Sequence, residues 1–376
     1  MTTTTGAVTD DARSGPPRIW LVAFATLAVM PVVVAVVRAL ADGWIPTGDN
    51  GLIATRVHAV FSADTPLLGV VSSASGAAGT LLNHPGPLLF QWLAIPTAVL
   101  GRDAGIVVGV GLLNALALVA VTWVGWRRGG VGGAGLATLF GASLAWAMGS
   151  ELLYDPWQPH SQMLPALAFL FLAWSVASTD LVLTPLSVVM GSMVMQTHLT
   201  YVFLVPVVLA VSVIVGVRSA RRADATRRVV PVLFVALVVG LVVWAPPLVE
   251  QVTSSRGNLT RLVGEAGKGS DAVGLVGAVR LSSDVVALPP FWFRPSMTRT
   301  FVPDGGTVGT TTKVVAEASA WSTAVAGLAW IAVLALLLLC GWRAHTRADQ
   351  PTVAAVGVSL AANVAGWITA ATIRVG

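Results

Sequence analysis

The 376-residue chain has a single cysteine, Cys340, and it lies inside an apolar run. One cysteine excludes an intrachain disulfide and any metal site built from several cysteines. The sequence therefore does not indicate whether the protein lies in an oxidising or a reducing compartment.

Charged residues are also scarce, at 10% of the chain, whereas 55% of the residues are hydrophobic. The mean hydropathy of +0.81 means that the chain carries more apolar surface than one soluble core can bury. This composition excludes an ordinary soluble domain. Because only helices and closed barrels span membranes, the long apolar runs predict an all-α polytopic membrane protein.

The net charge of +5 does not indicate nucleic acid as a partner, because the 22 Lys+Arg form no single basic face. About half of them lie near the N-terminus and in three short segments, the pattern of residues that set membrane topology. These are Arg13 and Arg18, Arg127 and Arg128, the run 218–228, and Arg343 and Arg347. Since short Lys/Arg-rich loops stay in the cytoplasm, they predict a multi-pass plasma-membrane protein with a cytoplasmic N-terminus.

About nine apolar runs are expected to cross the membrane, since a spanning helix needs about 20 apolar residues. They are 19–40, 104–126, 131–148, 163–178, 181–195, 199–217, 229–244, 320–342 and 351–373. Residues 1–17 are rich in Thr, Asp and Gly and are expected to be a disordered cytoplasmic tail. The first run is too long for a signal-peptide core, so it is expected to remain as a span of a transmembrane domain over 18–376.

The run 87–100 is apolar but only about a dozen residues long, which suits a re-entrant or interfacial helix better than a crossing. With this interpretation all the arginine segments lie inside, and two long loops, 41–86 and 246–319, lie outside. The alternative is a true short span. It would place Arg127 and Arg128 outside and would move the residues around Asp155 to the other face.

Four of the five histidines fall in segments that this topology places outside, namely His58, His84, His160 and His198. Asp49 and Asp155 lie in the same segments. Imidazole and carboxylate groups at a membrane are costly unless they pair, bind a ligand or face a water-filled cavity. Because nearby prolines end the helices, we expect these polar side chains to stand at helix ends around a shared cavity.

Each polar cluster also has a purely structural interpretation. Asp49 lies in Thr-Gly-Asp-Asn-Gly, whose residue types favour a turn, and 83–87 has the composition of a helix start. Trp157 beside Asp155 suits an interfacial anchor, and His198 suits a helix cap. The joint occurrence of the clusters on one predicted face favours a site.

The order of these motifs resembles the GT-C class of membrane glycosyltransferases, in particular actinobacterial relatives of the protein O-mannosyltransferase, aminoarabinose transferase and arabinofuranosyltransferase groups. The similarity covers about 19–201. It comprises an acid soon after the first span, His-Pro-Gly-Pro-Leu-Leu-Phe at 84–90, Asp-Pro-Trp-Gln-Pro-His at 155–160 and Gln-Thr-His at 196–198. Leu-Pro-Pro-Phe-Trp at 288–292 matches more loosely. The resemblance implies a GT-C-like helical bundle of about nine to eleven spans with two large outer loops.

This resemblance implies an inverting glycosyltransferase that moves a sugar from a polyprenyl-phosphate donor to a cell-envelope glycan or protein, among the membrane lipids of the outer leaflet. Asp49 matches the catalytic acid of the family by its position after the first span. It would accept the proton of the acceptor hydroxyl. The leaving phosphate needs positive or hydrogen-donating groups, and the substrate-binding candidates are Arg56, His84, Asp155, Trp157, His160, His198 and Arg294.

The sequence also departs from the family. No second acid follows Asp49 within a few residues, which puts a two-carboxylate metal site in doubt, and Asp155 is the candidate for a second acid. His and Asp can bind metal ions, so the sequence leaves open whether a divalent metal takes part, although no metal ligand is assigned. The chain is not expected to carry the large soluble C-terminal domain of some relatives, so acceptor recognition is expected in 246–319.

Two further classes compete with an enzyme. One is a transporter or flippase of a lipid-linked envelope precursor, and the other is a scaffold for envelope machinery. Transporters place ionisable groups near the bilayer midplane, whereas the apolar runs here contain almost no charge. A scaffold has no need of grouped His and Asp. The sequence favours the enzyme and does not indicate which sugar, acceptor or linkage it uses.

Overall fold

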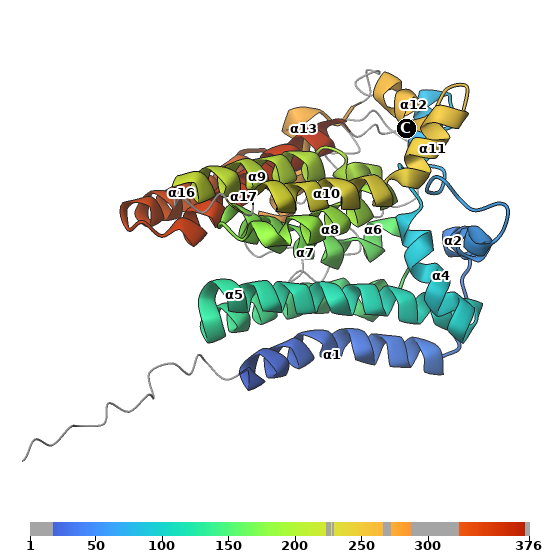
Figure 1. Cartoon of the computed structure of the whole chain (residues 1–376), viewed down its shortest axis with the longest axis horizontal. Helices are drawn as coiled ribbons and strands as arrows, with labels where there is room; N and C mark the ends of the chain where they lie inside the picture. Colours follow the sequence, from blue (N-terminus) through green and yellow to red (C-terminus); the bar gives the residue numbers. More distant parts are fainter. Residues whose placement is uncertain (1–17, 223–226, 228, 266–271, 287–322, 373–376) are drawn as a thin grey trace, which may run out of the picture.

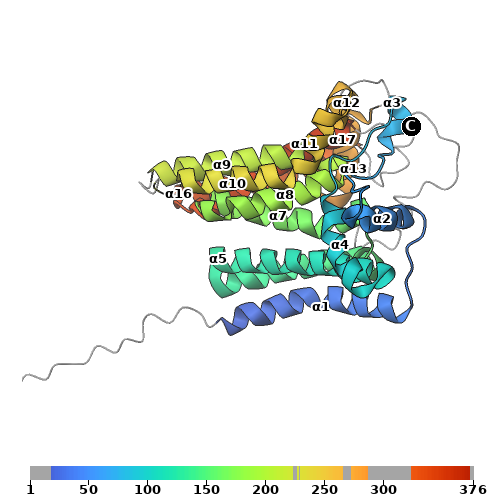
Figure 2. The same ribbon diagram turned by 45° about the vertical axis from the view of Figure 1, so that its right-hand side comes forward.

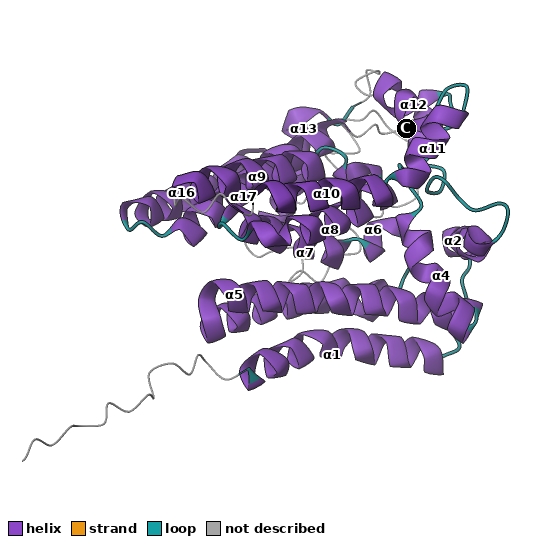
Figure 3. Ribbon diagram, viewed as in Figure 1, coloured by secondary structure: helices purple, strands orange, loops and turns teal. Residues whose placement is uncertain are grey.

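A computed structural model describes residues 18–222, 227, 229–265, 272–286 and 323–372, and over these residues the chain is helical and forms no strand (Figures 1 and 3). The predicted tail 1–17 lies outside the described residues. The elements in chain order are α1 (Ile19–Ala41), α2 (Asp49–His58), η1 (Ala59–Phe61), α3 (Ala74–Ala78), α4 (Leu88–Leu100), α5 (Arg102–Leu152), α6 (Gln158–Ser161), α7 (Met163–Ala177), η2 (Leu181–Leu183), α8 (Thr184–Thr197), η3 (Leu199–Tyr201), α9 (Leu204–Arg222), α10 (Val229–Val243), α11 (Ala245–Thr253), α12 (Asn258–Glu265), α13 (Gly274–Val286), α16 (Thr323–Thr346) and α17 (Gln350–Thr372).

Six helical stretches of the described chain are long and apolar enough to cross a membrane: α1, α5, α6 with α7, η3 with α9, α16 and α17. The pair α10 and α11, bent by 56°, forms a seventh if it counts as one span. Helix α8 with η2 is apolar but shorter. The protein is therefore an all-α multi-pass membrane protein over its described residues, and the apolar runs of the sequence coincide with its helices.

Helix α5 consists of two helices joined by a break at Gly130. This residue has φ 57°, a left-handed conformation that glycine adopts without steric cost. The two halves pack side by side, with the hydroxyls of Thr122 and Thr138 3.2 Å apart. A Cβ on Gly125 would collide with the carbonyl oxygen of Gly133. Such close contact between small residues holds helices together in lipid, where no hydrophobic effect drives them together.

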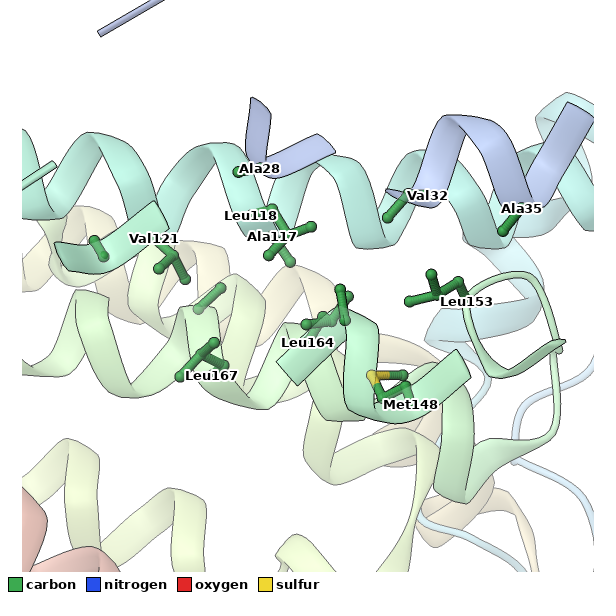
Figure 4. Packing of buried hydrophobic residues seen from close by; sticks show 13 residues of the cluster. Ala28, Val32, Ala35, Ala117, Leu118, Val121, Met148, Leu153, Leu164 and Leu167 are labelled. Atoms are coloured by element: carbon green, nitrogen blue, oxygen red, sulfur yellow. The ribbon is translucent and has the colours of Figure 1, made fainter. Parts of the chain in front are cut away.

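Helix α1 packs along α5 through small and branched side chains. Ala28, Val32 and Ala35 follow the helical spacing of one face and are buried against Ala117 and Leu118 (Figure 4). The opposite face of α1 leaves large apolar side chains exposed. In a membrane this exposed face meets lipid chains, which are as apolar as the side chains themselves.

Seven of the arginine residues gather at one end of the bundle. Arg127 and Arg128, at the break of α5, both pair with Asp180 after α7, at 2.6 Å and 2.7 Å. Near the same end of α7, the indole N–H of Trp174 donates to the carbonyl of Pro351, at the start of α17. Figures 1 and 2 show the start of α1 and the α16–α17 turn on this side. We call it the arginine end, defined by Arg18, Arg127, Arg128, Arg221, Arg222, Arg343 and Arg347.

The opposite end, which we call the polar end, carries α2, α3, α4, α6, α11 and α12 (Figures 1 and 2). It comprises the segments 42–87, 153–162, 196–201 and 245–265. Helix α4 runs across this end in both views, whereas α1 and α5 run along the bundle. It covers the polar end with its buried side chains Leu89, Phe90 and Leu93, which pack against Ile53 and Val57 of α2.

The region 246–319 was expected to be an outer loop, and its described residues are largely helical. They form most of α11 together with α12 and α13, whereas 287–319 lies outside the described part. Helix α13 contacts α16 and α17. The indole N–H groups of Trp330 and Trp367 both donate to Ser282 Oγ at 3.2 Å. This region is therefore partly packed into the bundle.

Candidate functional site

Asp155 is the centre of a polar cluster at the polar end. Its Oδ1 accepts hydrogen bonds from the side-chain amide of Asn50 (2.8 Å) and the backbone N–H of Trp157 (3.1 Å). Its Oδ2 lies 2.6 Å from His160 Nδ1. The bond to the second residue along the chain is an Asx turn, which Asp forms readily. We call Asn50, Asp155, Trp157 and His160 the aspartate cluster.

The contact with Asp155 fixes the role of each ring nitrogen of His160. Because a carboxylate only accepts hydrogen bonds, Nδ1 of His160 donates to it and Nε2 is left to meet a ligand. The rings of Trp157 and His160 pack edge to face, with their centroids 4.6 Å apart. Asp155 is buried, whereas Trp157 is 36% exposed. The buried carboxylate of Asp155 thus holds the imidazole of His160 in a fixed orientation, beside the partly exposed ring of Trp157.

A second group is the histidine pair, His84 and His198. Their rings stack with centroids 4.8 Å apart. His84 Nδ1 accepts from the backbone N–H of Leu199, and His198 Nδ1 accepts from that of Thr200, each at 3.2 Å. An imidazole that accepts at Nδ1 carries its proton on Nε2. Both rings therefore present an Nε2–H donor.

Burial sets the charge of the histidine pair. Burial lowers the pKa of His84 from 6.5 to about 3, with a smaller contribution from the charge of His198. Burial also lowers the pKa of His198. Burial disfavours the charged form because water no longer solvates it. At neutral pH both rings are neutral hydrogen-bond donors rather than cations.

The structure brings Asp49 next to the aspartate cluster. It is the first residue of α2 and the chain neighbour of Asn50. Its carboxylate is exposed and has no hydrogen bond or ion pair within the described residues. The helix N-terminus favours a negative charge at this position. Arg56 lies about two turns further along α2, is exposed, and is unpaired among the described residues; Arg294 lies outside them.

A buried lock connects the two predicted outer regions. Asn83 and Asn258 exchange two hydrogen bonds, of 2.9 Å and 3.0 Å, between backbone and side-chain groups. The backbone N–H of Asn258 donates to Glu250 at 2.9 Å. Arg261 bonds the carbonyl of Leu81 and lies 3.7 Å from Glu250. This asparagine lock, comprising Asn83, Glu250, Asn258 and Arg261, holds the segment before His84 against α11 and α12.

Sequence reasoning assigned no role to several polar residues that the structure places at the polar end. Asn50 and Gln196 belong to motifs noted above, and Gln162 follows the motif at 155–160. Their closeness to these motifs in the sequence was the signal that could have pointed to them. Asn258 and Glu250 had no signal, because their partners are far away in the chain. Several buried side-chain atoms have no hydrogen-bond partner in the described part, among them Asn50 Oδ1, Gln158 Nε2, Gln162 Oε1 and Gln196 Oε1.

Such unpartnered atoms are uncommon, because buried polar groups in proteins are nearly always hydrogen bonded. These atoms are shielded from solvent, so their unmet hydrogen-bonding capacity lies inside the polar end. Over the described residues, no three His, Cys, Asp or Glu side chains gather to hold a metal ion. Comparison with protein-family models, curated proteins and solved structures finds no match.

Proposed function

We propose that the protein is an inverting glycosyltransferase of the GT-C type, which moves a sugar from a polyprenyl-phosphate donor to a cell-envelope glycan or protein. One observation carries the proposal. Asp155 is held by Asn50, 105 positions away in the chain, and by His160, and Asn50 is the chain neighbour of the exposed Asp49. Two carboxylates and an oriented imidazole at a helix-bundle end suit proton transfer and the binding of sugar hydroxyls.

The proposed topology places the arginine end in the cytoplasm and the polar end outside the plasma membrane. The positive-inside rule supports this orientation, because seven arginine residues, among them Arg127 and Arg128, share one end of the bundle. Helix α5 then counts as two crossings, and α8 and the α10–α11 pair as one each. The total is about nine crossings, with α4 as an interfacial helix and the N-terminal tail inside.

In the proposed reaction the acceptor hydroxyl oxygen attacks the anomeric carbon on the side opposite the phosphate. A carbon–oxygen bond forms as the bond between the anomeric carbon and the phosphate oxygen breaks, and the electron pair leaves with the polyprenyl phosphate. Asp49 accepts the hydroxyl proton. Asp155 and His160 orient the substrate hydroxyls, and Trp157 offers an apolar face to the sugar ring.

The leaving phosphate needs hydrogen-bond donors and positive charge. The Nε2–H groups of His84 and His198 supply neutral donors, because both rings are uncharged at neutral pH. Arg56 supplies a cation, and Arg294 is a second candidate outside the described residues. This combination suits a donor whose charge is concentrated on one phosphate.

The distribution of ionisable residues supports an enzyme over a transporter or flippase. Transporters hold ionisable groups near the bilayer midplane on broken helices. In the described long helices, the Asp, Glu and Arg side chains lie near helix ends or at the break of α5. A transporter would be favoured if labelled lipid crossed vesicle membranes without any bond formation.

The test is sugar transfer in membranes that contain the full chain and a polyprenyl-phosphate sugar. We expect Asp49→Asn to lower the rate by about 100-fold or more, the usual size of a general-base contribution, and Asp155→Asn to lower the rate because the substrate hydroxyls lose an orienting group. Asp64→Asn is the matched control, since Asp64 is an exposed carboxylate in the same outer segment. Full activity of both site variants would refute the proposal. A chelator added to the parent shows whether a divalent metal takes part.

A further inference from the structure

A groove runs between α1 and the second half of α5, outside the clusters described above. Its volume is about 720 Å³, within the range of small-molecule and cofactor sites. Its floor includes Gly135, Ala142 and Gly149 of α5, which are spaced seven residues apart and so lie on one helix face. Because these residues are small, the two helices leave a channel there that larger side chains would fill.

The walls of this α1–α5 groove are apolar and face the membrane. Leu27 of α1 is 60% exposed, and Leu139 and Trp146 of α5 are 65% and 84% exposed. Along α1 the groove extends from Phe24 to Arg38, or about 21 Å at the helical rise per residue. A long apolar groove of this kind suits an extended hydrocarbon chain.

The polar end of the groove carries a positive charge. Arg38 is in the last turn of α1 and is the one charged residue among those that the structure places along the groove. Its guanidinium has no ion pair or hydrogen bond within the described chain. An unpaired guanidinium at the end of an apolar channel suits a phosphate, to which arginine donates two parallel hydrogen bonds.

The groove ends beside the aspartate cluster. Leu153 lines it and lies two residues before Asp155 in the chain. Tyr154, between them, has its pKa raised by burial first and then by the charges of Glu151, Asp155 and Asp42, while Arg38 opposes the shift. Arg38 and Asp155 therefore both lie close enough to act on the same phenol. A phosphate at Arg38 would place its attached group near the cluster.

We propose that the α1–α5 groove binds the hydrocarbon chain of a phosphate-headed lipid, with the phosphate at Arg38 and the head group directed to Asp155. This inference rests on the proposed function, in which that lipid is the polyprenyl-phosphate sugar donor, and it adds Arg38 to His84, His198 and Arg56 as a group that binds the donor phosphate. Three features support this occupant: the long apolar groove, the single cation at its polar end, and its continuity with the site. A membrane phospholipid and a second copy of the chain are the competing occupants.

The test uses the full chain in phosphatidylcholine nanodiscs and, as probe, a polyprenyl monophosphate with a photoreactive group on its chain. We expect crosslinks in α1 and in the second half of α5. Arg38→Gln should lower labelling about tenfold, since a lost charge-assisted hydrogen bond costs about 1.5 kcal/mol or more. Arg38→Lys should retain most of it. Ala142→Leu, which fills the floor, should lower labelling as well.

Two matched controls are available. Arg18→Gln removes an arginine at the other end of α1. Leu116→Trp changes an exposed side chain of α5 that lies outside the groove. Both should leave labelling unchanged. The proposal is overturned if crosslinks fall elsewhere, if phosphatidylglycerol competes as well as the polyprenyl phosphate, if Arg38→Gln labels like the parent, or if a second copy of the chain is crosslinked in place of the lipid.

The outcome for the groove is separable from the outcome for the enzyme, because the crosslinking needs no sugar transfer. Normal sugar transfer in Ala142→Leu, together with crosslinks elsewhere, would refute lipid binding in the groove without contradicting the proposed glycosyltransferase activity. Groove labelling that depends on Arg38, in a protein that transfers no sugar, would support the lipid site and refute the enzyme.

Discussion

Asn50 and Asp155 are 105 positions apart in the chain, and the side-chain amide of Asn50 donates a hydrogen bond of 2.8 Å to Asp155 Oδ1. This bond joins the first residues of α2 to the segment between α5 and α6. The carboxylate also accepts from the backbone of Trp157 and from His160, so three polar groups fix its position. Asp49 is the chain neighbour of Asn50 at the start of α2.

Removing the amide of Asn50 should loosen this arrangement. Asn50→Ala leaves a buried carboxylate with one partner fewer, and a hydrogen bond to a charged group contributes about 1.5–3 kcal/mol. We expect a lower melting temperature in detergent and about tenfold slower sugar transfer. Thr55→Ala, an exposed residue of α2 with a local bond to Gly51, is the control. Parent-like melting and transfer in Asn50→Ala would show that the bond is dispensable.

Stability should depend on pH through His84. Its pKa is about 3 in the folded protein against 6.5 in the unfolded chain, so between these values only the unfolded chain binds the proton. The free energy of unfolding should therefore fall as pH drops below about 6.5, by about 1.4 kcal/mol per pH unit. Melting curves at neutral and mildly acid pH measure the slope.

The part of this slope due to His84 is isolated by substitution. His84→Asn keeps an acceptor for the N–H of Leu199 and removes the titrating group, so it should flatten the slope. His58→Gln, at an exposed histidine of α2, should leave the slope as in the parent. Identical slopes in His84→Asn and the parent would contradict the assignment.

The asparagine lock should stabilise the polar end. Asn258→Ala removes two hydrogen-bonding atoms from a fully buried position and leaves the backbone of Asn83 unpaired, at a cost of about 1–3 kcal/mol per group. We expect faster proteolysis between α3 and α4 and at α12. Thr253→Ala, an exposed residue with a bond inside α11, serves as the control. Equal proteolysis rates would mean that the lock carries no stability.

The topology is tested by cysteine labelling in intact cells after Cys340→Ala removes the native thiol. Asp64→Cys at the polar end should react with a membrane-impermeant reagent. Arg347→Cys at the arginine end should react only after permeabilisation, because the positive-inside rule places that end in the cytoplasm. The reverse pattern would invert the proposed orientation.

Much of the helical framework was predictable from the sequence. The expected runs 104–126 and 131–148 coincide with the two halves of α5, and Gly129-Gly130 between them marks the break. The run 163–178 coincides with α7. These predictions succeed because a long apolar segment in lipid must satisfy its backbone within itself, so that local sequence determines the helix.

The contacts within the candidate site were not predictable in the same way. The motifs around Asp49, His84, Asp155 and His198 were recognised as polar clusters, but neither the Asn50–Asp155 bond nor the stacking of His84 on His198 follows from their spacing. The groove beside Arg38 could not be predicted from the sequence either, because its shape depends on how α1 lies against α5.

By itself, the sequence determined that the chain is an all-α membrane protein, roughly where its long apolar helices lie, and which segments are rich in arginine. The tertiary structure alone decided which polar residues meet. Helix formation depends on neighbours a few positions away, whereas hydrogen bonds such as those of Asn50 with Asp155 and Asn83 with Asn258 join segments more than 100 residues apart. Their partners are chosen by how the helices pack.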